Sequence, residues 1–85
     1  MITKTVLITQ AVKVTVDETK FTPEFLDEFQ RNFYGFTTID EHLEHLAQLH
    51  ARGIADNDSF IEGYGETSEM GIKFVCEFVE TEIER

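Results

Sequence analysis

The sequence is poor in several residue types, and each shortage excludes a kind of structure. Its one cysteine, Cys76, can form neither an internal disulfide nor a cysteine-based metal cluster. The single proline and five glycines are scattered, without linkers, internal repeats or low-complexity segments. No apolar run approaches the roughly 20 residues that cross a bilayer, and the first residues lack a charged stretch followed by an apolar one. We therefore expect no membrane span, no secretory signal and a cytoplasmic location.

Basic residues are also few. Seven Lys and Arg face 17 Asp and Glu, which gives a net charge of −10. Such a charge opposes direct binding of nucleic acid, because binding needs cationic groups that replace counterions. It also opposes docking on anionic membranes. Two interpretations stay open: the charge steers the protein toward a basic partner, or it keeps a small protein soluble.

Aromatic residues are abundant in this short chain. With 85 residues, the chain is expected to form a single domain over residues 1–85. Eight Phe and two Tyr supply the large apolar areas that a small core needs. Hydrophobic residues make up 41% and charged residues 28%, which is typical of a globular protein.

Residues 2–16 predict a long strand. Their apolar side chains recur every second residue, the period of a half-buried strand: Ile2, Val6, Ile8, Val12, Val14 and Val16. Gln10 interrupts this face at its middle, so the segment is either one strand with a bulge or a hairpin. No Gly, Pro or Asn-Gly marks a turn, which favours one strand.

Two helices are predicted next. Thr22 and Pro23 suit the N-cap and first position of a helix, and its apolar stripe is Phe25, Phe29 and Phe33. Gly35 is expected to end it with a positive φ. Thr38 and Glu41 form a capping box for a second helix, which Gly53 should stop.

The last third of the chain predicts strands around an acidic loop. Residues 54–71 hold five acids and no base, with a short strand expected within 59–64. Residues 72–79 alternate as a clear strand, and residues 80–85 are expected to fray. This order predicts an α+β fold of the order β-α-α-β-β, with an antiparallel sheet of about three strands and two helices on one face.

Three histidines and the cysteine are candidates for chemistry. His42, His45 and His50 share one helix, as in some zinc sites. At about 100° per residue, His50 falls near the centre of the apolar face, His42 at its edge and His45 toward solvent. They do not converge, so packing or surface roles are favoured. Cys76 alternates with core residues, where a thiol is inert. We predict a protein that is not an enzyme and binds no metal or cofactor.

Acidic side chains gather in two places that could contact a partner. The preferred set lies in the acidic loop and is flanked by two aromatic residues: Asp56, Asp58, Phe60, Glu62, Tyr64, Glu66 and Glu69. The second set surrounds the first helix: Asp17, Glu24, Asp27 and Glu28. Tyr64 stands between two glycines, and both a core role and an interface role are open for it.

Three stretches resemble small acidic proteins encoded by bacteriophages and prophages. They are residues 14–25 (VTVDETKFTPEF), 39–53 (IDEHLEHLAQLHARG) and 60–65 (FIEGYG). One group of such proteins is the anti-CRISPR proteins, which are short, often acidic, and inhibit Cas complexes by occupying nucleic-acid sites. The resemblance implies a non-enzymatic inhibitor in the bacterial host cytoplasm that mimics DNA and binds a CRISPR–Cas effector. It carries over no functional residue.

Two alternatives to this inhibitor remain. The first is a small metal-dependent or catalytic module that uses the helix histidines. The second is a phage accessory protein that self-associates through a sheet edge. The sequence leaves the oligomeric state and the identity of any target open.

Overall fold

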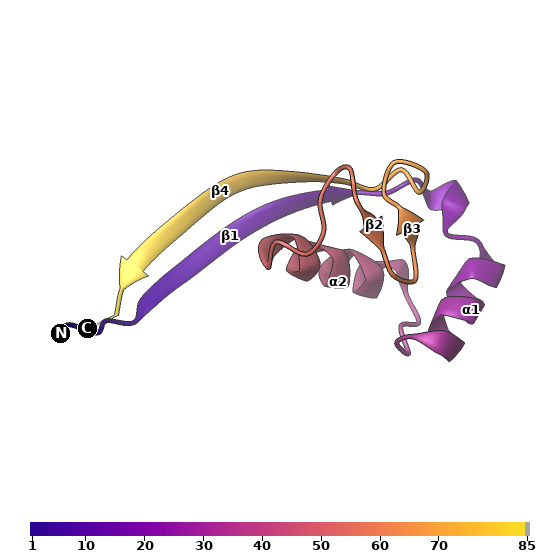
Figure 1. Ribbon diagram of the computed structural model, residues 1–85. Helices are drawn as coiled ribbons and strands as arrows, with labels where there is room; N and C mark the ends of the chain where they lie inside the picture. The colour runs from indigo at the N-terminus through magenta and orange to yellow at the C-terminus, as the bar shows by residue number, and fades with distance from the viewer. Residues whose placement is uncertain (85) are drawn as a thin grey trace.

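The computed structural model, which describes residues 1–84, is a long β-ribbon with a small helical body at one end (Figure 1). The ribbon consists of strands β1 (Val6–Thr15) and β4 (Lys73–Ile83), paired antiparallel. It makes the molecule 52 Å long but only 20–23 Å wide. The prediction of one strand near the start of the chain is confirmed, as is the α+β class.

The strands form two small sheets, so the predicted single sheet of about three strands is wrong. β1 pairs only with β4 in the described chain, and β2 (Phe60–Ile61) pairs with β3 (Gly65–Glu66). The observed order is therefore β-α-α-β-β-β, with a short 3-10 helix, η1 (Glu18–Lys20), after β1. β4 continues to Ile83, so the expected fraying from residue 80 is also wrong up to that point; Arg85 lies outside the described residues.

The ribbon contains a β-bulge near its middle. Ala11 is opposite Phe78 and Val12 is opposite Cys76, so Glu77 is an extra residue in β4. Bulges bend a strand and increase its twist. The ribbon curves toward the side on which the second helix lies (Figure 1). The sequence prediction of a bulge is thus confirmed, although the extra residue belongs to the partner strand.

Both helices begin at the predicted caps. α1 (Pro23–Asn32) begins after Thr22, whose hydroxyl accepts the N–H of Phe25 at 3.1 Å. α2 (Ile39–Ala51) begins after Thr38, whose hydroxyl accepts the N–H of Glu41 at 3.3 Å. α2 ends before Gly53, which has a φ of 75°.

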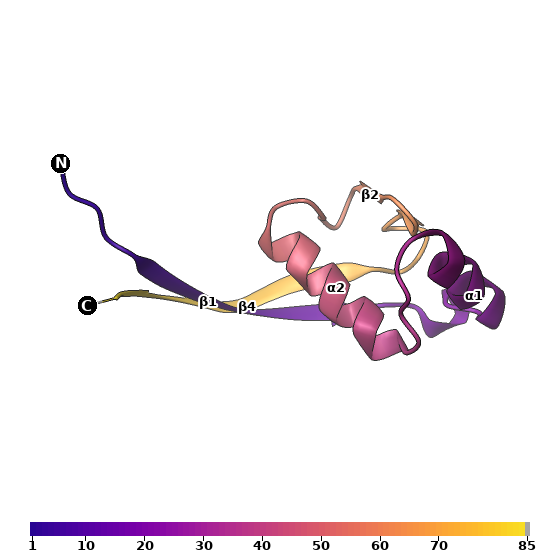
Figure 2. The same ribbon diagram turned by 90° about the horizontal axis from the view of Figure 1, so that it is seen from below.

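The end of α1 differs from the prediction. The helix stops at Asn32 with Phe33 as its C-cap, and Gly35 is not among the glycines with positive φ. α1 also lies beyond the end of the ribbon rather than on its face, whereas α2 packs on β1 (Figure 2). The expectation that two helices cover one sheet face therefore holds for α2 alone.

The core lies where the two helices, the β2–β3 hairpin and the inner end of the ribbon meet. Its buried hydrophobic members are Phe21, Phe29, Leu46, Ala55, Ile61, Tyr64, Ile72 and Phe74. The outer half of the ribbon lies outside this body. Cys76, which lies on β4 opposite Val12, is exposed, so its predicted core position is wrong. No helix in the described chain is long and apolar enough to cross a membrane.

Candidate partner-binding surface

The three histidines of α2 have separate partners. His42 is fully buried, and its Nδ1 lies 2.8 Å from the hydroxyl oxygen of Tyr64. The Nδ1 of His50 lies 2.8 Å from the carbonyl oxygen of Ala55, and its ring stacks on Phe74. His45 packs beside Tyr34, with ring centroids 4.9 Å apart. Within residues 1–84, no three His, Cys, Asp or Glu side chains are grouped so that they could hold a metal ion.

The burial of these histidines corrects the helical-wheel prediction. His42, which was expected at the edge of the apolar face of α2, is the most buried of the three imidazoles. His50, which was expected near the centre of that face, is only partly buried. Burial lowers the pKa of His42, with a smaller contribution from the nearby His45, so the neutral form is favoured. The ring is enclosed by phenylalanines from α1 and the loops: Phe21, Phe25, Phe29 and Phe36. This environment suits packing.

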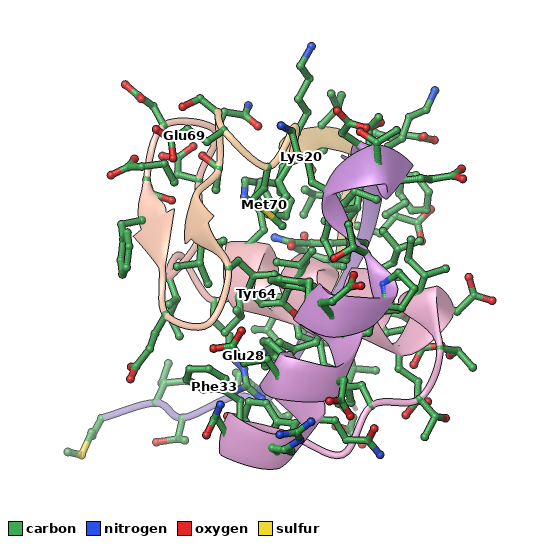
Figure 3. All side chains as sticks on the ribbon, turned by 90° about the vertical axis from the view of Figure 1, so that its right-hand side faces the viewer. Lys20, Glu28, Phe33, Tyr64, Glu69 and Met70 are labelled. Atoms are coloured by element: carbon green, nitrogen blue, oxygen red, sulfur yellow. The ribbon has the colours of Figure 1, made fainter. Side chains whose placement is uncertain are left out.

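Tyr64 belongs to the core. Its side chain is 5% exposed and contacts the rings of Phe29 and Phe25. Burial raises the pKa of the phenol, so the hydroxyl stays protonated and can share a hydrogen bond with His42. Figure 3 shows Tyr64 between the hairpin and α1. Of the two roles left open by the sequence, the structure favours the core role, and the ring is hidden from a partner.

The β2–β3 hairpin places aromatic and acidic side chains together at the surface. Phe60 and Glu66 are opposite each other across the hairpin, and both are exposed. Glu62 lies at the hairpin tip, in the turn closed by the bond from the N–H of Tyr64 to the carbonyl of Ile61. Phe60 is 67% exposed, so a large apolar ring faces solvent beside two carboxylates.

A hollow of about 200 Å³ lies beside this hairpin. Its lining combines exposed aromatic rings, aliphatic side chains and one carboxylate: Phe33, Tyr34, His45, Leu49, Ile54, Phe60, Ile61 and Glu62. A second hollow of about 160 Å³ lies on the other side of Phe33 and includes Glu28. The rings of Phe33 and Tyr34 are 44% and 53% exposed. Phe33 thus lies between two hollows that each contain a carboxylate.

Local sequence explains how the hairpin reaches α1. Gly63 has a φ of 92°, and a Cβ built on it would lie 2.7 Å from Cε2 of Phe29. Only glycine allows this close approach without strain. At the hairpin base, buried Thr67 accepts the N–H of Ser59 with its hydroxyl at 3.2 Å. These contacts fix the position of the tip relative to Phe33.

The five acids of the preferred cluster do not converge on one point. Asp56 and Asp58 belong to the turn before β2, where the Asp56 carboxylate accepts the N–H of Asn57 at 2.7 Å. Glu69 lies at the opposite end of the hairpin from Phe33, as Figure 3 shows. All five acids are exposed, but only Glu62 lines the aromatic hollow.

The second acidic cluster is partly engaged in local structure. The Asp17 carboxylate caps η1 by accepting the N–H and the hydroxyl of Thr19, which lowers its pKa. Asp27 forms an ion pair with Arg31 one turn along α1. Glu24 and Glu28 are exposed, and Glu28 lies beside Phe33. Of this set, Glu28 is the member that adjoins the hairpin.

We call six exposed residues the hairpin surface: Glu28, Phe33, Tyr34, Phe60, Glu62 and Glu66. Sequence reasoning found its acids and Phe60 but assigned Phe33 to the core stripe and overlooked Tyr34. The available signal was the Phe-Tyr-Gly sequence at the end of α1, where side chains leave the helix face. Comparisons with protein-family models, curated proteins and solved structures found no match.

Proposed function

We propose that the protein is a non-enzymatic inhibitor that binds a basic surface of a protein partner through the hairpin surface. The observation that carries the proposal is the hollow in which aromatic rings and the Glu62 carboxylate come together. A lysine or arginine side chain from a partner suits this chemistry, because ring faces attract cations and a carboxylate makes charge-assisted hydrogen bonds with them.

The charge distribution supports the same partner class. Residues 54–71 contain no Lys or Arg, and the whole chain carries a net charge of −10. Such a field accelerates encounter with a basic protein, whereas exposed aromatic rings supply affinity after contact. Electrostatics and anchoring therefore act at different stages of binding.

A CRISPR–Cas effector is the target that we propose to test first. The reason is the resemblance to small acidic phage proteins, together with the basic grooves in which Cas complexes hold nucleic acid. In this mode, the carboxylates Glu28, Glu62 and Glu66 take the place of phosphates. The protein would then compete with DNA for the effector.

The test compares two variants that lose the same charge. The triple variant Glu28→Gln, Glu62→Gln, Glu66→Gln changes the carboxylates of the hairpin surface, and Glu77→Gln, Glu80→Gln, Glu82→Gln changes exposed positions of β4. Purified Cas effectors are the probe, with binding and competition with target DNA measured at low salt and at about 0.3 M salt. We expect the hairpin variant to lose binding at low salt and the β4 variant to retain most of it.

The outcomes separate the parts of the proposal. Equal binding by both variants at each salt concentration would show that the hairpin acids make no local contact. Retained binding by the double variant Phe33→Ala, Phe60→Ala would remove the aromatic anchors from the mechanism. A parent protein that binds none of the effectors would exclude them as targets.

A further inference from the structure

Within residues 1–84, no other segment covers the outer half of the ribbon. Val6, Ile8, Val79 and Ile83 lie there with 47–64% of their surfaces exposed. A two-stranded sheet alone is at best marginally stable in water and needs packing against another layer. Figures 1 and 2 show this part of the ribbon projecting from the body, with nothing against either face. We call residues 6–10 and 79–83 the outer ribbon.

The bare face of the outer ribbon continues the face that forms the core. On β1, Val12 and Val14 pack against the core on the side of α2, and Ile8 and Val6 follow at the same two-residue period. Their cross-strand partners, Thr81 and Ile83, lie on the same face. A hollow of about 410 Å³ between Ile8, Gln10 and Ala51 marks where α2 ends. The apolar face therefore extends beyond its covering helix.

We propose that a second copy of this chain supplies the missing layer. The two ribbons lie antiparallel, with β1 beside β1 across a two-fold axis at Gln10, and form a four-stranded sheet of order β4-β1-β1-β4. In this register Val6 is opposite Val14 of the second copy, and Ile8 is opposite its Val12. The α2 helix that covers Val12 and Val14 of the second copy then adjoins Val6 and Ile8 of the first.

The pattern of β1 favours this register. On the face that continues the core, β1 carries Val6, Ile8, Gln10, Val12 and Val14. Two apolar residues therefore lie on each side of one central polar residue. Antiparallel self-pairing centred on Gln10 matches every apolar residue of this face with another apolar residue. It also places the two Gln10 amides together at the axis, where they can bond to each other. A two-fold interface requires such a self-complementary surface.

The free edge of β4 is unsuited to the same pairing. The Asn57 side chain occupies it at Phe74, accepting the backbone N–H at 2.6 Å and donating to the carbonyl at 3.1 Å. Beyond this point β4 and the residue after it carry four acids: Glu77, Glu80, Glu82 and Glu84. Residues 1–16 contain Lys4 and Lys13 and no acid. In the proposed dimer the acids lie on the outer edges, where charge opposes the addition of further strands.

The apolar side chains of the bare face form one exposed patch. On this face the outer ribbon carries four large apolar side chains that are about half exposed or more, Val6, Ile8, Val79 and Ile83, whereas Leu7 and Phe78 lie on the opposite face. Together these four side chains present roughly 350 Å² of apolar surface, which is the size of the largest patch on a typical monomer and is often functional.

Light scattering on the purified protein tests the proposal across a range of concentrations. The parent should have twice the mass of one chain and dissociate on dilution. Ile8→Glu should be a folded monomer, because Ile8 contributes to the interface and is 64% exposed in one copy. The matched control is Ile54→Glu, which changes the same residue type at 60% exposure on the body and should stay dimeric.

Crosslinking tests the register. In a Cys76→Ser background, Gln10→Cys should form a disulfide-linked dimer on mild oxidation, because directly paired strand residues meet the geometry of a disulfide. Glu24→Cys on α1 should stay uncrosslinked in the same background. A monomeric parent, or an Ile8→Glu variant as dimeric as the parent, would overturn the proposal and leave the face to a different partner. A dimer in which the Gln10→Cys variant does not crosslink would overturn the pairing of β1 with β1.

Discussion

Phe29 is the aromatic side chain on which the body of the protein most depends. It is 3% exposed and lies in the middle of α1. Six aromatic rings have centroids within 6.4 Å of its own: those of Phe25, Phe33, Tyr34, Phe36, His42 and Tyr64. They come from α1, α2, the connection between these helices and the hairpin. Truncation to alanine therefore opens a cavity where four segments meet.

The expected cost is large relative to the stability of the domain. A buried Phe→Ala change costs about 3–5 kcal/mol, through lost transfer energy and the cavity left behind. At about 0.05–0.15 kcal/mol per residue, a chain of this length has a free energy of unfolding of about 4–13 kcal/mol. Phe29→Ala should thus remove between about a quarter and all of the stability. Phe60→Ala, at 67% exposure, should change it by less than about 0.5 kcal/mol.

Urea unfolding followed by circular dichroism measures both variants. All proteins are compared at one concentration, because association of the folded chain would raise the apparent stability. We expect a much lower midpoint for Phe29→Ala and a parent-like midpoint for Phe60→Ala. Equal losses would refute the reasoning, since they would mean that burial in this aromatic cluster does not set the stability.

Three further predictions concern single contacts. In the folded state the pKa of His42 is held below its ordinary value of 6.5, so the unfolded chain takes up the proton first as pH falls. The free energy of unfolding, measured by urea titration, should therefore fall as pH drops below about 6.5, and it should fall less steeply in His42→Phe. Burial and the nearby Arg52 also lower the pKa of His45, so His45 adds a slope of the same sign. Gly63→Ala should lower the melting temperature, because its Cβ would meet Phe29 at a φ of 92°, whereas Gly35→Ala, at a position where no atom is within 4 Å, should not. Asn57→Ala should cost about 1–3 kcal/mol in urea unfolding, because it leaves two partly buried backbone groups at Phe74 unpaired; Asn32→Ala, which removes one exposed bond, is its control.

Local signals in the sequence predicted the elements well. The two-residue period located β1, and the caps at Thr22 and Thr38 located both helix starts. These features depend on contacts between residues close in the chain. The division of the strands into two sheets depends instead on how far β1 and β4 extend together. The alternation of residues 72–79 gave no sign that pairing would continue to Ile83.

The errors about burial have a common physical origin. A helical wheel identifies an apolar face, but it does not show which neighbour packs against it. α1 approaches α2 on the side of His42, so this polar ring is as fully buried as Leu46 on the same helix. Cys76 illustrates the same limit on a strand, because alternation assigns a face without showing where its cover ends. The hairpin surface was half predicted, since acids are visible in a sequence but the exposure of Phe33 is not.

The two uncovered surfaces lie at opposite ends of the molecule and differ in chemistry. The hairpin surface combines carboxylates with aromatic rings, whereas the outer ribbon face is aliphatic around Gln10 (Figure 1). Substitutions this far apart and without shared contacts should act additively. Ile8→Glu should therefore abolish assembly without changing the binding of one chain to a basic partner, and the hairpin triple variant should weaken that binding without changing the mass of the assembly. The affinity of one chain for the partner is measured on a probe with a single binding site. If Ile8→Glu lowers this affinity, the outer ribbon belongs to the partner interface and not to an interface with a second copy.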